Sequence, residues 1–173
     1  GNCNKNGVYD IAMYVNDSLV YHITMDSVSF EKTRMINAHL DYPEQRLKKN
    51  YVHKCYSLPG NTLPIIKEQM DRGVILLKDN EKKKIRFTVM DFNHNISVME
   101  FFVKKLSGDP AFKYPPYNYY LAYDKGNIIQ DTGIKVNFTD KTFFKNQNFG
   151  YKNDSEKSSR TYSNLYTLGN PNI

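Results

Sequence analysis

Two short runs near the start of the chain alternate apolar and polar residues, as a β-strand with one buried face does. In residues 8–15, "VYDIAMYV", every second residue from Tyr9 to Val15 is apolar, whereas Asp10 falls on the opposite face. Residues 19–25, "LVYHITM", repeat this pattern after the turn residues "NDS". The two runs therefore predict an antiparallel hairpin.

The same period of two returns later in the chain. Residues 84–91, "KIRFTVMD", and residues 96–104, "ISVMEFFVK", flank the turn "DFNHN" and predict a second hairpin. Between the hairpins, residues 73–83 predict a short strand and a charged turn. The content of 14 Tyr and 10 Phe also favours strands over helices. We therefore predict an all-β protein whose main part is an immunoglobulin-like β-sandwich.

A long basic stretch, residues 29–61, interrupts the strand pattern. Pro43 is well suited to the first turn of a short helix over residues 43–50, because its fixed φ fits a helix and its missing N–H is not needed there. Residues 61–72 predict a second, weak helical turn that Gly73 ends in a left-handed conformation. Both are expected as short helical insertions over the rim of the sandwich.

A change of composition divides the chain into two parts. Residues 107–120, "SGDPAFKYPPYNYY", contain three prolines and a group of tyrosines. We predict a sandwich over residues 5–106, a linker over 107–116 and a smaller β domain over 117–173. About 60 residues are marginal for an independent core, so the smaller domain is expected to be stabilised by contacts with the sandwich or with protein outside this chain.

The expected strands of the smaller domain surround a long polar loop at residues 145–160. These strands are residues 117–123, 133–138 and 163–169.

The net charge of +6 does not by itself indicate a nucleic-acid partner. The densest basic runs, residues 46–50 and 81–86, lie where a helix and a turn are expected, so they are interpreted as solvated faces. No apolar run approaches the roughly 20 residues of a membrane helix. No hydrophobic leader is visible either, so the chain is interpreted as cytosolic, already processed or an excised piece.

Histidine and carboxylate spacing offers one familiar metal pattern, His22 with Asp26. On a strand these residues are roughly 13 Å apart, at about 3.3 Å per residue, which is too far to hold one ion. The remaining histidines are His39, His53 and His94. No nucleophile or phosphate-binding motif occurs, so the residues themselves predict no catalytic, cofactor-binding or metal-binding site in this chain.

Only two cysteines are present, Cys3 and Cys55. A bridge between them remains open, although two free thiols are favoured, and no disulfide framework exists. His53 and Cys55 share a face if they lie on a strand, which leaves two alternatives: a reactive pair or a small buried thiol. The second is favoured.

The tyrosines around the predicted linker could stack on sugar rings or on a peptide. The simpler interpretation, which we favour, is that they pin one domain against the next. These residues are Tyr114, Tyr117, Tyr119 and Tyr120.

Five motifs follow one another with characteristic spacing between residues 7 and 104: a Gly-Tyr-Ile start, S-F-x-x-T-R-x-I-N, D-Y, L-P-G-N-x-L and D-x-x-x-N-x-S. The residues that carry them are Gly7, Tyr9 and Ile11; Ser29, Phe30, Thr33, Arg34, Ile36 and Asn37; Asp41 and Tyr42; Leu58, Pro59, Gly60, Asn61 and Leu63; Asp91, Asn95 and Ser97. This region resembles the C-terminal non-catalytic β-sandwich region that follows the catalytic domain in lysostaphin-like zinc peptidoglycan endopeptidases of Gram-negative gut bacteria. His94 departs from the turn glycine expected in that family.

The resemblance implies a non-catalytic accessory module of a cell-envelope metallopeptidase, exported to the periplasm or envelope. Such a module positions or shields the peptidase domain or engages the wall, so its implied partners are that domain and peptidoglycan. The family's zinc ligands have no counterpart here, so zinc and catalysis are expected outside this chain. The alternatives are a free-standing carbohydrate-binding or adhesive surface module that uses the tyrosines, and an independent hydrolase.

Within the basic stretch we predict a structural role. Arg34 and Asp41 are expected to form a buried or half-buried polar pair that holds the loop. The sharper alternative is ligand binding through its basic surface, with Lys48 and Lys49 as the contacts.

Overall fold

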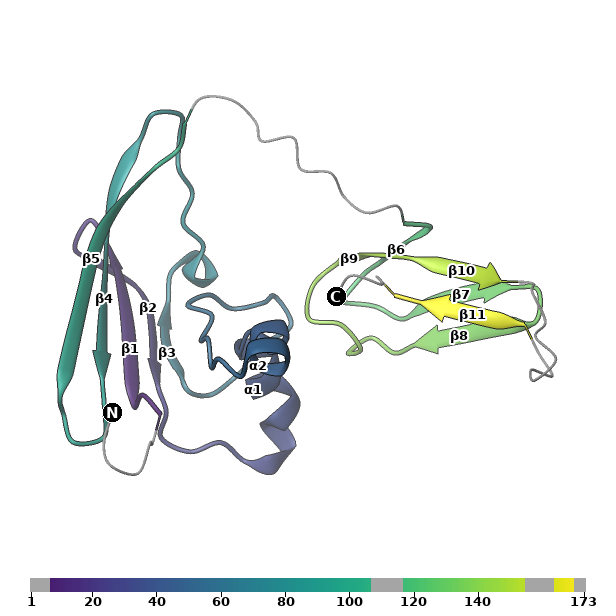
Figure 1. Cartoon of the computed structure of the whole chain (residues 1–173), viewed down its shortest axis with the longest axis horizontal. Helices are drawn as coiled ribbons and strands as arrows, with labels where there is room; N and C mark the ends of the chain where they lie inside the picture. The colour runs from purple at the N-terminus through teal and green to yellow at the C-terminus, as the bar shows by residue number, and fades with distance from the viewer. Residues whose placement is uncertain (1–6, 107–116, 155–163, 170–173) are drawn as a thin grey trace. The chain divides into compact units, whose positions relative to one another are not determined.

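The computed structural model describes residues 7–106, 117–154 and 164–169 (Figure 1). The chain divides into two compact units, residues 1–109 and residues 110–173, and the structure of both is mostly β. The predicted linker, residues 107–116, lies outside the described residues. No helix in the described ranges is long and apolar enough to cross a membrane.

The first unit is built on a five-stranded antiparallel sheet in the order β3-β2-β1-β4-β5 (Figure 1). Both predicted hairpins are confirmed, since β1 pairs with β2 and β4 pairs with β5. The strands are β1 (Asp10–Val15), β2 (Ser18–Thr24), β3 (Ile66–Gln69), β4 (Lys82–Met90) and β5 (Ile96–Lys104).

The period of two separates the sheet into two faces. The core face carries the odd-numbered residues of β1, β4 and β5, and its buried centre is formed by Ile11, Met13, Tyr21, Ile23 and Ile85. The polar face carries the even-numbered residues of the same strands. This division places apolar side chains from four strands in one layer.

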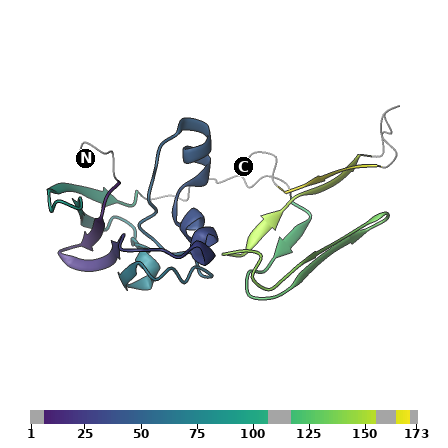
Figure 2. The same cartoon turned by 90° about the horizontal axis from the view of Figure 1, so that it is seen from below.

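The predicted two-sheet sandwich is not what the described residues form, because all strands of the first unit belong to one sheet. The core face is covered instead by connecting chain, of which Cys55 and Ile75 pack on the core. Both views place the helices on the β3 side of the sheet, away from β5 (Figures 1 and 2). The β4–β5 side is therefore covered least.

Two α-helices follow β2, preceded by the 3-10 turn η1 (Phe30–Lys32). The predicted helix over residues 43–50 is present as α2 (Tyr42–Lys48), whose first turn is capped by the side chain of Asp41. The helix ends at Lys49 in a left-handed conformation. α1 (Thr33–His39) was not predicted from the sequence.

Two expectations for the return to the sheet are wrong. Residues 66–69 form strand β3 rather than a helical turn, because their backbone continues the pairing beside β2, where Thr24 N–H donates to the carbonyl of Ile65. The strand predicted after Gly73 is absent, because residues 74–78 have no regular structure. The helical turn before it is limited to η2 (Asp71–Gly73). The left-handed Gly73 is confirmed, with φ of 78°.

Within residues 117–154 and 164–169, the second unit forms three two-stranded sheets, β6–β9, β7–β8 and β10–β11. The predicted polar loop over residues 145–160 is wrong in part, because β9 and β10 lie within it, and β7 was not predicted. Leu121 and Ile129 are buried. The strands are β6 (Tyr119–Leu121), β7 (Asn127–Asp131), β8 (Ile134–Phe138), β9 (Gln147–Phe149), β10 (Tyr151–Asp154) and β11 (Leu165–Leu168).

Candidate functional site

The chain that leaves α2 turns back under the core face of the sheet. A β-bridge joins Leu40 to His53, and the N–H of Lys54 donates to the carbonyl of His39. A Cβ on Gly73 would lie 2.5 Å from the carbonyl oxygen of Cys55, so only glycine allows this close approach. His53 and Cys55 are thus fixed beside the apolar core.

Two histidines meet at the end of α1. His39 is 2% exposed, and its Nε2 lies 3.2 Å from Nδ1 of His53, so one ring donates a hydrogen bond to the other. Burial, followed by the neighbouring His53 and Lys54, lowers the pKa of His39 to about 4. Burial also lowers the pKa of His53. Both rings are therefore neutral at pH 7.

Cys55 is not an activated nucleophile. Burial raises the pKa of its thiol to about 11, and its sulfur lies 4.0 Å from the carbonyl oxygen of His53 rather than against a ring nitrogen. Of the two alternatives from the sequence, this geometry favours the small thiol over the reactive pair, and Cys55 is half-buried. Among the described residues Cys55 is a free thiol, and Cys3 lies outside them.

Two adjoining cavities flank Cys55 on the core face, and we call them together the apolar groove. One, of about 440 Å³, lies toward β4 and β5, and the other, of about 470 Å³, lies toward the 73–75 segment. Cys55 lines both. The first is lined by Val8, Ile11, His53, Cys55, Phe87, Val89, Ser97, Val98 and Met99; the second by Met13, Cys55, Tyr56, Gly73, Val74 and Ile75. A groove of this composition suits apolar side chains.

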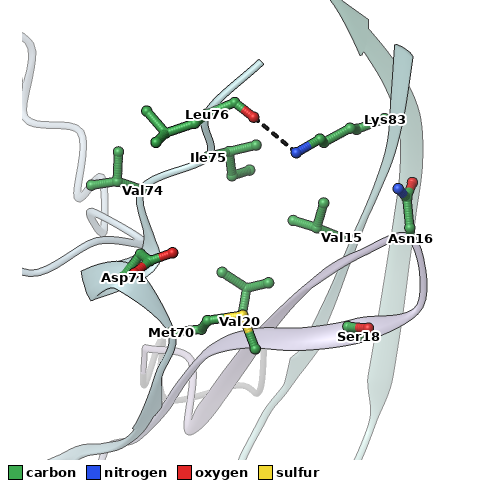
Figure 3. A pocket seen from close by; sticks show the side chains of 10 residues that line it. All are labelled: Val15, Asn16, Ser18, Val20, Met70, Asp71, Val74, Ile75, Leu76 and Lys83. Carbon is green, nitrogen blue, oxygen red and sulfur yellow. Dashed lines mark hydrogen bonds between the residues drawn. The ribbon is translucent and has the colours of Figure 1, made fainter. Parts of the chain in front are cut away.

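A third cavity, of about 320 Å³, lies near the turn between β1 and β2 (Figure 3). Val15, Val20 and Ile75 form its apolar part, and Lys83 spans one side by donating to the carbonyl of Leu76 at 2.8 Å. Ile75 also lines the apolar groove. The 74–76 segment therefore borders the apolar groove on one side and this third cavity on the other.

The His22 and Asp26 pattern does not form a metal site. His22 Nε2 lies 2.7 Å from Asp10 Oδ2, whereas Asp26 accepts hydrogen bonds from Tyr9 and Lys67. The hydrogen bond from Lys67 is the main cause that lowers the pKa of Asp26. Across residues 7–106, 117–154 and 164–169, no three His, Cys, Asp or Glu side chains are grouped as metal binding requires.

The predicted contacts of the basic stretch are distributed over both helices. Lys48 is exposed and forms an ion pair with Glu44 at 2.7 Å, and Lys49 is exposed at the end of α2. Arg34 is exposed on α1, whereas Asp41 is half-buried and accepts a hydrogen bond from the N–H of Glu44. Capping of α2 explains why an aspartate is present at position 41. The pairing of Asp41 with Arg34 stays a prediction.

The predicted tyrosines do not share one platform. Tyr119 is half-buried against Tyr151, with ring centroids 6.3 Å apart, whereas Tyr120 is exposed on the other face of β6. Tyr117 lines a cavity of about 300 Å³ together with Lys152. Tyr114 lies outside the described residues.

The sequence did not predict the histidine pair, because the two rings are 14 positions apart in the chain and are brought together by the β-bridge between Leu40 and His53. It also did not predict the exposure of Phe30, whose side chain is 98% exposed in η1. The only signal for Phe30 was its place in the S-F-x-x-T-R-x-I-N motif.

Comparison of the chain with protein-family models, with curated proteins and with solved structures finds no match in any of the three.

Proposed function

We propose that this chain is a non-catalytic accessory module of a cell-envelope zinc metallopeptidase, whose peptidase domain it contacts through the first unit. The zinc and the cleavage of peptidoglycan cross-links belong, in this proposal, to residues outside the chain. The protein acts in the periplasm or envelope.

The motifs behind the resemblance support a shared local fold. Asp41 caps α2, and the buried Asn61 donates to the carbonyl of Met35 at 3.1 Å, which ties the L-P-G-N turn to α1. Asp91 accepts hydrogen bonds from the N–H groups of Asn93 and Asn95 and so closes the β4–β5 turn. These positions require polar side chains for structural reasons.

Phe30 is the observation that carries the proposal. It belongs to the same motif set, yet its ring lies 98% in solvent, so packing within this unit gives no reason for an aromatic residue there. A Phe side chain that becomes buried against a partner contributes roughly 1.5–3 kcal/mol. We therefore assign Phe30 to the interface with the peptidase domain.

The finer fold assignment belongs to this proposal as well. We propose that the five-stranded sheet corresponds to one layer of an immunoglobulin-like sandwich and that the peptidase domain, in place of a second sheet of this unit, covers the open part of the core face. The apolar groove, with Phe87 and Met99 on its sheet side, supports this second contact.

The test compares this chain with the complete reading frame that encodes it. The longer protein is expected to hold zinc and to release dye from labelled peptidoglycan, whereas this chain alone releases none. Calorimetric titration of this chain with the separate peptidase domain is expected to show binding that Phe30→Ala weakens by about 10-fold to 100-fold. Leu47→Ala, which truncates another exposed apolar side chain, is the matched control.

Stoichiometric zinc and dye release by this chain alone would contradict the proposal. A reading frame without a peptidase domain would contradict the assignment of the parent protein, and equal effects of the two substitutions would contradict the role of Phe30.

A second function is favoured by the cavity beside Tyr117 in the second unit. Its lining combines the ring of Tyr117 with Asn118, Lys152 and Thr167, so a sugar could stack on the ring and form hydrogen bonds with the polar groups. In this alternative the chain is a free-standing carbohydrate-binding or adhesive module. Binding to one member of a glycan panel, lost in Tyr117→Ala and kept in Phe30→Ala, would select it over the accessory role.

A further inference from the structure

Strand β5 forms one edge of the five-stranded sheet and exposes apolar side chains on both faces. Five of them are between 39% and 64% exposed, namely Ile96, Val98, Met99, Phe101 and Phe102. An edge strand of nine residues with this much apolar surface is a template for pairing with another strand. The opposite edge, β3, has only four residues.

The β4–β5 turn determines which backbone groups of β5 point outward. The N–H of Asp91 donates to the carbonyl of Asn95, so these two residues form a hydrogen-bonded pair. Bonded and non-bonded pairs alternate along an antiparallel ladder, and the register continues without a shift from Met90–Ile96 to Lys82–Lys104. The odd-numbered residues of β5 therefore bond to β4, and the even-numbered residues direct their N–H and C=O groups outward.

Two charges on this edge lie four residues apart. Glu100 contacts Lys84 at 3.1 Å, whereas Lys104 lies directly opposite another cation, Lys82. Like charges in directly opposite positions are unfavourable. Lys104 would therefore gain from a carboxylate on the outer side of β5.

We propose that β5 pairs antiparallel with β5 of a second copy of this chain, with Phe102 at the two-fold axis. This register extends the sheet to ten strands and joins outward-directed residues to outward-directed residues. Its opposed pairs are Phe102 with Phe102, Glu100 with Lys104, Val98 with Leu106, Phe101 with Val103 and Met99 with Lys105, whose ammonium group already lies 2.7 Å from Asp79 of its own chain.

The neighbouring registers are less complementary. A two-fold axis at Glu100 places the two carboxylates opposite each other, and an axis at Phe101 places Glu100 opposite Phe102 and Val98 opposite Lys104. Only the axis at Phe102, of these three, converts both charges of each copy into cross-strand ion pairs. It also places two 75% exposed Leu106 side chains against Val98. Charge complementarity therefore selects a second copy and fixes its register.

Sedimentation equilibrium of the whole chain tests the proposal through charge exchange. The unchanged chain is expected to dimerise, and Glu100→Lys or Lys104→Glu alone is expected to raise the dimer Kd about 30-fold, because two attractive pairs become two repulsive ones. An equimolar mixture of the two variants is expected to form a heterodimer, since every lysine then faces a glutamate. Glu31→Lys, which changes an exposed charge in η1, is the control for net charge.

Val98→Pro provides a second test that leaves the charges unchanged. It removes an outward N–H that β4 does not use, so the fold, measured by circular dichroism, is expected to persist while the dimer is lost. A chain that stays monomeric at millimolar concentration overturns the proposal and assigns the edge to a different protein. Failure of the mixed variants to associate overturns the register, as does a dimer that Val98→Pro leaves intact.

Discussion

The buried histidine pair predicts that the first unit loses stability as the pH falls from about 6.5 to about 4. His39 has a pKa of about 4 in the folded protein and the ordinary 6.5 when unfolded. Below pH 6.5 the unfolded chain therefore binds a proton that the folded chain does not, and unfolding becomes easier. The contribution of His39 is fully present above pH 6.5 and is lost on acidification.

The magnitude follows from the two pKa values. At about 1.4 kcal/mol for each pH unit, the difference amounts to about 3 kcal/mol from His39, and the lowered pKa of His53 acts in the same direction. Because the side chain of His39 is 2% exposed, solvent screening reduces this figure little. A loss of this size is a large part of the stability of a small domain.

The assay is urea unfolding at several pH values between 7.5 and 4, read by hydrogen exchange of amides in β1, β2 and β4 so that the first unit is measured separately. The matched variant is His39→Gln, whose amide nitrogen can occupy the place of Nε2 and donate to His53 without titrating. Acid effects on carboxylates cancel in the difference between the two proteins. We expect this variant to lose less stability than the unchanged chain by up to about 3 kcal/mol at pH 4. Parallel stability curves for the two proteins would refute the reasoning.

Three further predictions concern single positions. Gly73→Ala is expected to destabilise the first unit by about 2–3 kcal/mol in urea unfolding, because φ is 78° and the Cβ would clash with Cys55, whereas Gly7→Ala, with open space around it, serves as the neutral control. His94→Gly is expected to raise the free energy of unfolding by about 0.5–1 kcal/mol, since His94 has φ of 64°; an unchanged or lower free energy of unfolding would count against this. In a Cys3→Ser background, Cys55 is expected to react with a disulfide reagent at pH 7 about 100-fold more slowly than a free thiol, until urea exposes it.

The hairpins could be predicted from the sequence because their information is local. Each strand shows its own period of two, and short turns such as 16–17 and 91–95 join neighbours in the chain. β3 was missed because residues 66–69 carry one apolar residue and become a strand only by pairing with β2, more than 40 residues earlier. β9 and β10 were missed for the same reason, since their polar sequences pair with distant β6 and β11.

The covering layer of the sheet was harder still to predict. Leu63 and Ile65 are buried in a connection with no regular structure, and Gly73 allows the backbone of Cys55 to approach. Apolar residues in irregular chain have no period to recognise, so a second sheet was the natural expectation. The histidine pair could not be predicted for the same reason, because His53 lies in this irregular connection.

The two surfaces proposed for the first unit are adjacent on β5 and share Val98, which lines the apolar groove and lies opposite Leu106 of the second copy in the proposed register. Met99 faces the apolar groove on the core face, whereas Glu100 and Lys104 lie on the polar face and use the outer edge. Phe30 lies in η1, outside the sheet altogether. Because Phe30 and Glu100 lie on different elements, we expect the peptidase domain and a second copy to bind at the same time. Phe30→Ala and Glu100→Lys should then act independently, with free energies that add within about 0.5 kcal/mol in the double variant; a larger deviation, measured by titration and sedimentation together, would mean that the two partners compete for one surface.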